Sequence, residues 1–207
     1  MKNSTTPPHD EELLRLMLAG DGEAFERLYD RYQAGIYRFA LRMSGSEAVA
    51  EDVTQDVFLT LMRDGGQYQA RGSFAAYLFT IARHGVIRRL QRDRRFVALG
   101  EETEGGELPI QEQLVAEGDP LTELTRGELV DAVRQAIAAL PVHYREVLLL
   151  CHLHEMSYAE AASVVGCEVG TVRSRLFRAR AMVAERLGAL KSDEPPQKKL
   201  NSARCFA

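Results

Sequence analysis

The clearest chemical signal in this sequence is a group of four arginines on one short stretch. Arg173, Arg175, Arg178 and Arg180 lie within little more than two helical turns, and acidic residues are almost absent among them. A guanidinium can donate two hydrogen bonds to the edge of a guanine, and a well-formed contact of this kind discriminates between bases by about 1–3 kcal/mol. Ordinary solvated helix faces instead mix both charges. The spacing therefore favours a helix that binds nucleic acid.

The residues before and between these arginines predict the elements that position them. Ser157 and Glu160 have the spacing of a capping box, which begins a helix, and Gly166 supplies a turn after it. Val172 and Leu176 then keep the 3.6-residue apolar period of a second helix. A helix, a tight turn and a basic helix form a helix-turn-helix, whose second helix enters the major groove.

A second basic segment, over residues 67–95, mixes arginines with aromatic rings. Unpaired bases stack on aromatic rings with about 1–3 kcal/mol per base, while cations follow the backbone. A packed core accounts for the periodic apolar residues of the segment, but it explains Tyr68, Arg71 and Tyr77 less well. These three residues are candidates for contacts with single-stranded nucleic acid.

An acidic helix face precedes this basic segment. Asp52, Gln55, Asp56 and Leu59 share one side of a predicted helix, turned away from its valine and leucine stripe. Such a face is either an ordinary solvated surface or a surface that docks another protein. Carboxylates are repelled by phosphate, so this face and the basic one are not both expected on DNA.

The apolar periodicity predicts an all-α fold with two small helical domains. Apolar residues recur at steps of three and four in two blocks, and no stretch of comparable length alternates with period two. Between the blocks, eight acidic residues accompany one arginine among several glycines and prolines, which predicts a flexible acidic linker. The predicted divisions are a disordered tail over 1–10, a first domain over 11–95, the linker over 96–126, a second domain over 127–190 that contains the helix-turn-helix, and a disordered tail over 191–207.

Composition excludes several classes of protein. The chain has 207 residues, a formal net charge of −4 and 45% hydrophobic residues, which suits a globular protein with room for one large or two small cores. The alternation of basic and acidic segments favours two small cores. Three cysteines without a CxxC pair argue against a disulfide framework. The absence of a long apolar run argues against membrane insertion and for the cytoplasm.

No motif predicts a catalytic site, a metal or a cofactor. Cys151 and His154 lie near His143, but their spacing fits no common zinc pattern, and Cys151 ends an apolar run in which a free cysteine packs as a small hydrophobe. The chain has neither a glycine-rich phosphate loop nor a nucleophile next to a base. We therefore expect that it is not an enzyme.

Taken together, these motifs resemble the extracytoplasmic-function (ECF) class of bacterial sigma factors, in the sigma-70 family. The resemblance covers residues 11–95 and 127–188, and its strongest parts are the segments 50–59, 73–83 and 140–180, in that order. It implies an RNA polymerase sigma factor that directs promoter-specific transcription initiation in a stress or envelope response. The implied partners are core RNA polymerase, promoter DNA and a cognate anti-sigma factor.

The resemblance also implies a role for each group of candidate residues. The residues implied in binding core polymerase are Asp52, Gln55, Asp56, Phe58 and Leu59. Those implied at the minus-ten promoter element are Tyr68, Arg71, Ser73, Tyr77, Arg83, His84, Arg88 and Arg89. Those implied at the minus-thirty-five element are Thr171, Arg173, Ser174, Phe177 and Arg178.

Four positions depart from the family pattern. Tyr77 stands where a tryptophan is usual, and His84 and Arg88 replace the commoner asparagine and aspartate, which bears on promoter selectivity. Glu168 replaces a usual serine at the turn, which weakens the cap of the basic helix and places a negative charge near DNA.

Two other functions fit parts of the sequence. A self-sufficient repressor or activator would use the same helix-turn-helix, with the first block binding a ligand or a second copy of the chain. An anti-sigma-like protein or an adaptor would bind only other proteins and would not need two basic segments. Stimulation of core polymerase at particular promoters distinguishes a sigma factor from both.

Overall fold

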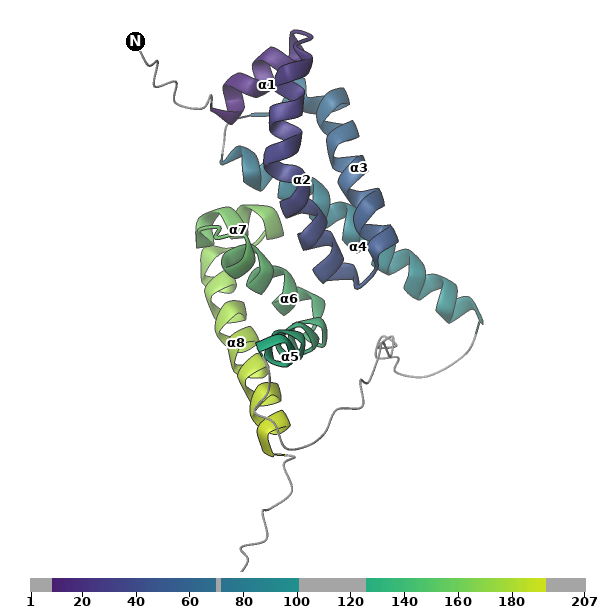
Figure 1. The fold of residues 1–207 in the computed structure, drawn as a ribbon, viewed down its shortest axis with the longest axis vertical. Helices are drawn as coiled ribbons and strands as arrows, with labels where there is room; N and C mark the ends of the chain where they lie inside the picture. The colour runs from purple at the N-terminus through teal and green to yellow at the C-terminus, as the bar shows by residue number, and fades with distance from the viewer. Residues whose placement is uncertain (1–8, 70–71, 101–125, 193–207) are drawn as a thin grey trace, which may run out of the picture.

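The computed structural model describes residues 9–69, 72–100 and 126–192, and within these ranges every regular element is a helix (Figure 1). The predicted all-α class is confirmed. The first half contains α1 (Asp10–Leu18), α2 (Gly22–Ser44), α3 (Glu47–Asp64), the 3₁₀ turn η1 (Gly65–Gln67) and α4 (Phe74–Gly100). The second half contains α5 (Arg126–Ala138), α6 (Val142–Leu148), the π-helical turn η2 (Leu149–Leu153), α7 (Tyr158–Val165) and α8 (Val169–Ser192).

Local capping explains where the helices of the first half begin and end. The Asp21 carboxylate accepts hydrogen bonds from the backbone N–H of Glu23 and Ala24, at 2.9 and 3.2 Å, and so begins α2. Gly45, with φ of 74°, ends α2 in the left-handed conformation that glycine adopts without strain. Helix α2 then packs against α1, α3 and α4. It is the central helix of this half, so its ends fix where the neighbouring helices start.

The second half forms the predicted helix-turn-helix. The Ser157 hydroxyl accepts a hydrogen bond from Glu160 N–H at 3.2 Å, while the Glu160 carboxylate accepts from Ser157 N–H at 2.9 Å, which confirms the capping box. Gly166 ends α7 with φ of 73°. Val172 and Leu176 are buried against the rest of this half, and α8 packs on α6 and α7. The basic side of α8 is thereby turned outward.

The element boundaries differ slightly from the predicted divisions. Helix α1 begins at Asp10, inside the predicted tail, and α4 continues to Gly100, five residues beyond the predicted end of the first domain. Helix α8 reaches Ser192, two residues into the second predicted tail. The described residues do not include Arg71, Cys205, most of both predicted tails, or residues 101–125 of the linker predicted over 96–126.

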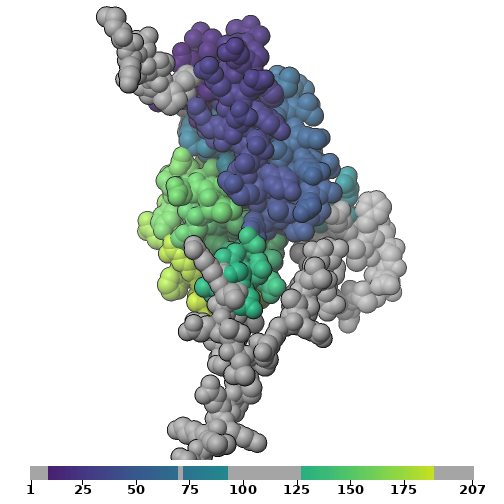
Figure 2. All heavy atoms as spheres, viewed as in Figure 1, coloured from purple at the N-terminus to yellow at the C-terminus, as the bar shows by residue number. Residues whose placement is uncertain are grey.

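The two halves share one apolar core, and the expectation of two separate small cores is wrong in this respect. Buried side chains from both halves form a continuous cluster, because α4 packs on α7 and α2 packs on α6 and η2. Figure 2 shows the second half, in green, lying directly against the first, in purple and blue. Sequence periodicity reports that a helix has an apolar face, but it does not report which helix covers that face.

Neither a membrane span nor a metal cluster is present among the described residues. In these ranges, no helix has both the length and the apolar composition needed to span a bilayer. Within the same ranges, histidine, cysteine and acidic side chains form no group of three that could hold a metal ion.

Two glycines near the turn give a test of the helix-turn-helix geometry. We expect Gly166→Ala to lower the free energy of unfolding by about 1–2 kcal/mol, because alanine is strained at φ of 73°. Gly170→Ala is the matched control, since Gly170 is helical with no atom near its added Cβ. It should raise stability by about 0.5–1 kcal/mol. Urea unfolding measures both, and equal effects would contradict the left-handed turn.

Candidate nucleic-acid interface

The outward side of α8 carries the residues that the sequence predicted for base contacts. Phe177 is 74% exposed, and Arg173, Ser174 and Arg178 are also exposed around it. Thr171 is half-buried, and its carbonyl accepts a hydrogen bond from the Ser174 hydroxyl at 3.0 Å. These side chains lie on the first turns of α8, where a helix docked in a major groove meets base edges.

Other cations of α8 are occupied by neighbouring side chains. Arg175 lies 3.6 Å from the Glu146 carboxylate of α6, and Arg180 donates a hydrogen bond to His152 Nε2 at 2.9 Å. Burial and the nearby Arg180 lower the pKa of His152, so this imidazole is neutral and able to accept. Arg173 and Arg178, by contrast, point into solvent from the N-terminal turns of the helix.

Aromatic rings gather where α4 begins. Tyr68 packs edge-on against Phe74 with ring centroids 5.5 Å apart and lies 5.1 Å from Tyr77. Burial raises the pKa of both tyrosines, so both keep their phenolic protons. The Tyr68 hydroxyl donates to the Gly72 carbonyl at 3.2 Å, and the Ser73 hydroxyl accepts from Ala76 N–H and caps α4. Both tyrosines are only half-buried, so part of each ring remains accessible.

The basic residues of α4 separate into free and paired cations. His84 and Arg88 are exposed. Arg83 is mostly buried and makes an ion pair of 2.7 Å with Glu146 in the second half. Arg89 is only 16% exposed. Arg83 and Arg89 were both predicted at the minus-ten element, and in this conformation neither guanidinium is available.

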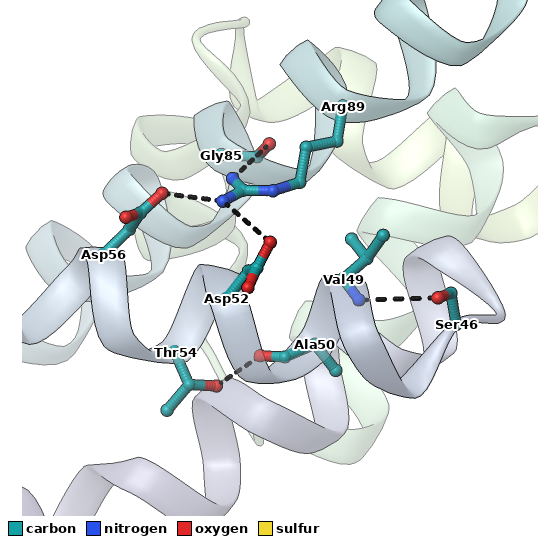
Figure 3. Close-up of polar contacts among 8 residues, drawn as sticks. All are labelled: Ser46, Val49, Ala50, Asp52, Thr54, Asp56, Gly85 and Arg89. Atoms are coloured by element: carbon teal, nitrogen blue, oxygen red, sulfur yellow. Dashed lines mark hydrogen bonds and ion pairs between the residues drawn. The ribbon is translucent and has the colours of Figure 1, made fainter.

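Arg89 joins the basic helix to the acidic one (Figure 3). Its guanidinium donates to Asp56 at 2.8 Å and to the Gly85 carbonyl at 3.4 Å, and it lies 3.7 Å from Asp52. A Cβ at Gly85 would lie 3.4 Å from the Val53 side chain and 3.6 Å from the Arg89 guanidinium. A residue with a larger side chain at this position would therefore crowd the contact. Two carboxylates predicted to bind a protein thus also hold α3 against α4.

The acidic face of α3 is exposed as predicted, with one exception. Asp52, Gln55 and Asp56 are exposed, and Leu59 is 62% exposed. Phe58, in contrast, is 4% exposed and packs against the rings of Phe25 and Tyr29, so it shapes the surface from beneath.

Tyr29, whose ring lies 4.7 Å from that of Phe58, and Met62, three residues after Leu59 on α3, were not predicted, but both are exposed apolar side chains. Sequence reasoning missed Tyr29 because it lies on α2 and not on α3. It missed Met62 because this residue lies one helical turn beyond Leu59. Acidic groups around apolar side chains suit a protein partner better than a solvated face.

Sequence reasoning also missed two adjacent buried charges on α6, Arg145 and Glu146. Both side chains are buried, and Glu146 is 2% exposed. Their signal in the sequence is their position inside the apolar stretch 142–151, where two adjacent charges are unexpected. Glu146 pairs with Arg83 and Arg175, so it contacts both predicted DNA-binding helices.

Two family models match this chain. Residues 28–96 match the model described as sigma-70 region 2, and residues 131–183 match the model described as sigma-70, region 4. The first range contains the predicted polymerase-binding and minus-ten residues. The second contains the helix-turn-helix.

Curated relatives resemble the chain over most of their length. The ECF RNA polymerase sigma factor SigW of Bacillus subtilis is 31% identical over 170 residues, which cover 81% of this chain and 91% of SigW. The RNA polymerase sigma-H factor of Pseudomonas aeruginosa is 31% identical over 193 residues, which cover 89% of this chain and 97% of that protein.

Solved structures share the fold. CnrH, in complex with the cytosolic domain of CnrY, superposes with a TM-score of 0.63 at 26% identity, covering 87% of this chain and 97% of CnrH. The sigma factor RpoE of Bartonella quintana, in complex with the anti-sigma factor NepR, gives a TM-score of 0.62 at 24% identity, covering 79% and 96%.

The Arg89 network can be tested by a double-mutant cycle. We expect Arg89→Ala and Asp56→Ala to show a coupling free energy of about 1 kcal/mol, because Arg89 is largely buried. Arg134 and Asp131, an exposed pair at 2.8 Å on α5, are the control and should couple by less than about 0.5 kcal/mol. Guanidinium unfolding measures both cycles. Equal couplings would mean that Arg89 is free to reach DNA.

Proposed function

This chain belongs to the ECF class of the sigma-70 family of RNA polymerase sigma factors, and we propose how its surfaces divide the work of that class. A sigma factor binds core RNA polymerase and directs promoter-specific transcription initiation. The observation that carries the division is the separation of the exposed residues into three surfaces. These are an acidic and apolar face on α3, an aromatic and basic face at the start of α4, and a basic face on α8.

The α8 face reads the minus-thirty-five element. Arg173 and Arg178 are exposed on either side of Phe177 at the N-terminal turns of the second helix of a helix-turn-helix. Arginines there can reach guanine edges, and an aromatic ring can contact a thymine methyl group. Thr171 and Ser174 complete this set of contacts. Arg180, nearer the middle of α8, faces phosphate.

The α4 face reads and holds the minus-ten element. Tyr68 and Tyr77 form an aromatic platform, Ser73 lies between them in the sequence, and Arg71 belongs to the same short segment. A base flipped out of the non-template strand would stack there, while His84 and Arg88 contact the backbone. Arg83 joins this surface once its ion pair with Glu146 is broken.

The α3 face binds core polymerase. Asp52, Gln55 and Asp56 share this face with the exposed side chain of Leu59, and Tyr29 adds apolar surface to it. A partner with basic residues around an apolar pocket would complement this surface. Phe58 supports it by packing on the Tyr29 ring.

Several finer assignments rest on the family. The protein acts in the cytoplasm, where the polymerase is, and supports a stress or envelope response. A cognate anti-sigma factor holds it inactive, a role for which the complex of the Bartonella quintana sigma factor RpoE with its anti-sigma factor NepR is the parallel. The polymerase supplies the chemistry of RNA synthesis, so the chain needs no cofactor and no catalytic residue.

The decisive experiment mixes the purified protein with core polymerase and a library of promoter fragments. We expect the two to co-purify and to start transcription at a subset of the fragments. A self-sufficient repressor would bind DNA without stimulating core polymerase. An adaptor would bind polymerase without choosing promoters.

Leu59→Glu tests the polymerase surface. We expect this change to weaken binding to core polymerase at least about tenfold, because a charge would replace an apolar side chain that the partner must desolvate. Leu18→Glu on α1 is the matched control, since Leu18 is similarly exposed. It should leave the affinity unchanged. A competition assay against labelled wild-type protein measures both, and identical affinities would remove Leu59 from the interface.

Arg178→Ala tests base reading by α8. We expect it to lower binding of the holoenzyme to its preferred promoter by about 1–3 kcal/mol while lowering non-specific binding less. Arg186→Ala, at an exposed position further along α8, is the control and should not change promoter choice. An equal loss on every DNA sequence would assign Arg178 to phosphate instead.

A further inference from the structure

Gly170 lies on the same side of α8 as the residues assigned to the minus-thirty-five element. Residues three, four and seven positions apart share one face of an α-helix. From Gly170, these steps lead to Arg173, Ser174 and Phe177. All four residues are exposed, whereas Val172, on the opposite side, is buried. Gly170 is therefore the most N-terminal residue of the face that we assign to DNA.

The fold itself gives no reason for a glycine at this position. Gly170 is not among the described glycines with a positive φ, so its backbone conformation suits any residue of a helix. A Cβ built on Gly170 meets no protein atom within 4 Å, so packing does not exclude a side chain either. Glycine is less stable in a helix than alanine, because it loses more backbone freedom on folding. The residue thus lowers the stability of α8 with no gain in packing.

Other glycines of the protein show what such a reason looks like. Gly166 turns the chain with φ of 73°, and a Cβ at Gly85 would lie 3.4 Å from the Val53 side chain. A third use of glycine is to let the backbone come close to a ligand, since no side chain stands between the two. Gly170 has the exposure that this third use requires.

The short side chain of Ser174 also requires a close approach of α8 to DNA. The Ser174 hydroxyl donates to the Thr171 carbonyl at 3.0 Å, so it stays near the surface of the helix. A hydroxyl held there can meet a base edge only when the helix lies deep in the major groove. Gly170 precedes Ser174 by one turn on the same face. A side chain at position 170 would therefore meet the DNA before Ser174 does.

We propose that Gly170 is a positioning residue for recognition of the minus-thirty-five element. Its missing side chain lets the first turn of α8 come close enough for Arg173 and Ser174 to bind base edges. A Cβ would stand about 1.5 Å out from the backbone, whereas good hydrogen bonds span a range of only about 0.5 Å. Any side chain at position 170 would hold the helix away from the bases. This inference rests on the proposed assignment of α8 to the minus-thirty-five element.

The inference requires stability and DNA binding to change in opposite directions. Gly170→Ala and Gly170→Leu both introduce strong helix formers, so both should raise the urea concentration at which the protein unfolds. We expect Gly170→Ala to weaken binding of a preferred duplex at least about fivefold, and Gly170→Leu at least about fiftyfold, because the longer side chain displaces the helix further. A folding defect would instead lower stability and binding together.

Gly22→Ala is the matched control. Gly22 is an exposed glycine in the first turn of α2, and its added Cβ meets no protein atom within 4 Å. It lies on none of the surfaces assigned to DNA. This change should raise the stability as Gly170→Ala does, and it should leave DNA binding unchanged.

The measurement begins with wild-type protein bound to core polymerase, which selects preferred duplexes from a pool randomised at the minus-thirty-five element. Fluorescence anisotropy then gives the affinity of each holoenzyme for a selected duplex and for an unrelated duplex of equal length. We expect the Gly170 variants to lose affinity mainly for the selected duplex, because phosphate contacts carry no sequence information. Arg173→Ala should cost less affinity in the Gly170→Leu protein than in the wild type, because that arginine no longer reaches its base.

Three results would overturn the inference. They are an unchanged affinity of Gly170→Leu for the selected duplex, an equal loss on both duplexes, and an Arg173→Ala effect of the same size in both proteins. Failure of the proposed function is a separate result, since it would appear as a wild-type holoenzyme that starts at no promoter. The protein alone then selects the duplexes, because a self-sufficient DNA reader would use the same face of α8. A protein that selects no sequence in either form would overturn both proposals.

Discussion

The structure depends on two buried charges of opposite sign that are adjacent in the chain. Arg145 donates to the carbonyls of Met43, Ala138 and Leu140, which lie at or beyond the ends of α2 and α5. Helix C-termini leave carbonyls without partners, so one guanidinium satisfies groups from both halves of the protein. Burial lowers the pKa of Arg145, and removing its guanidinium would leave buried carbonyls without partners, at about 1–3 kcal/mol for each. The two charges therefore fix where α6 lies.

Because α6 is fixed in this way, Glu146 faces two helices with cationic surfaces. The carboxylate neutralises Arg83 and Arg175, and each arginine gains a partner that it would otherwise find in phosphate or water. Arg89 shows the same pairing in the first half, where it takes Asp52 and Asp56 as partners. Three arginines of the two helices predicted to bind DNA are thus paired with carboxylates in the structure.

Sequence patterns predicted the local structure well and the partners of each face poorly. The capping box of Ser157 and Glu160 and the turn at Gly166 depend on residues close in the chain, so their geometry follows from spacing. Phe58 and Arg89 were predicted as contact residues, yet both are largely buried by helices that are distant in sequence. The single core has the same cause. Periodicity gives the direction of a side chain, whereas its neighbours depend on how helices pack.

A need for polymerase follows from the cost of separating the two strands of the promoter. Separating about five base-pair steps at about 1.4 kcal/mol each requires about 7 kcal/mol, while one base captured on an aromatic ring returns about 1–3 kcal/mol. Polymerase can favour melting only through contacts that are stronger in the melted complex than on closed duplex DNA. We therefore expect that the free protein does not melt promoter DNA and that it acts within the holoenzyme.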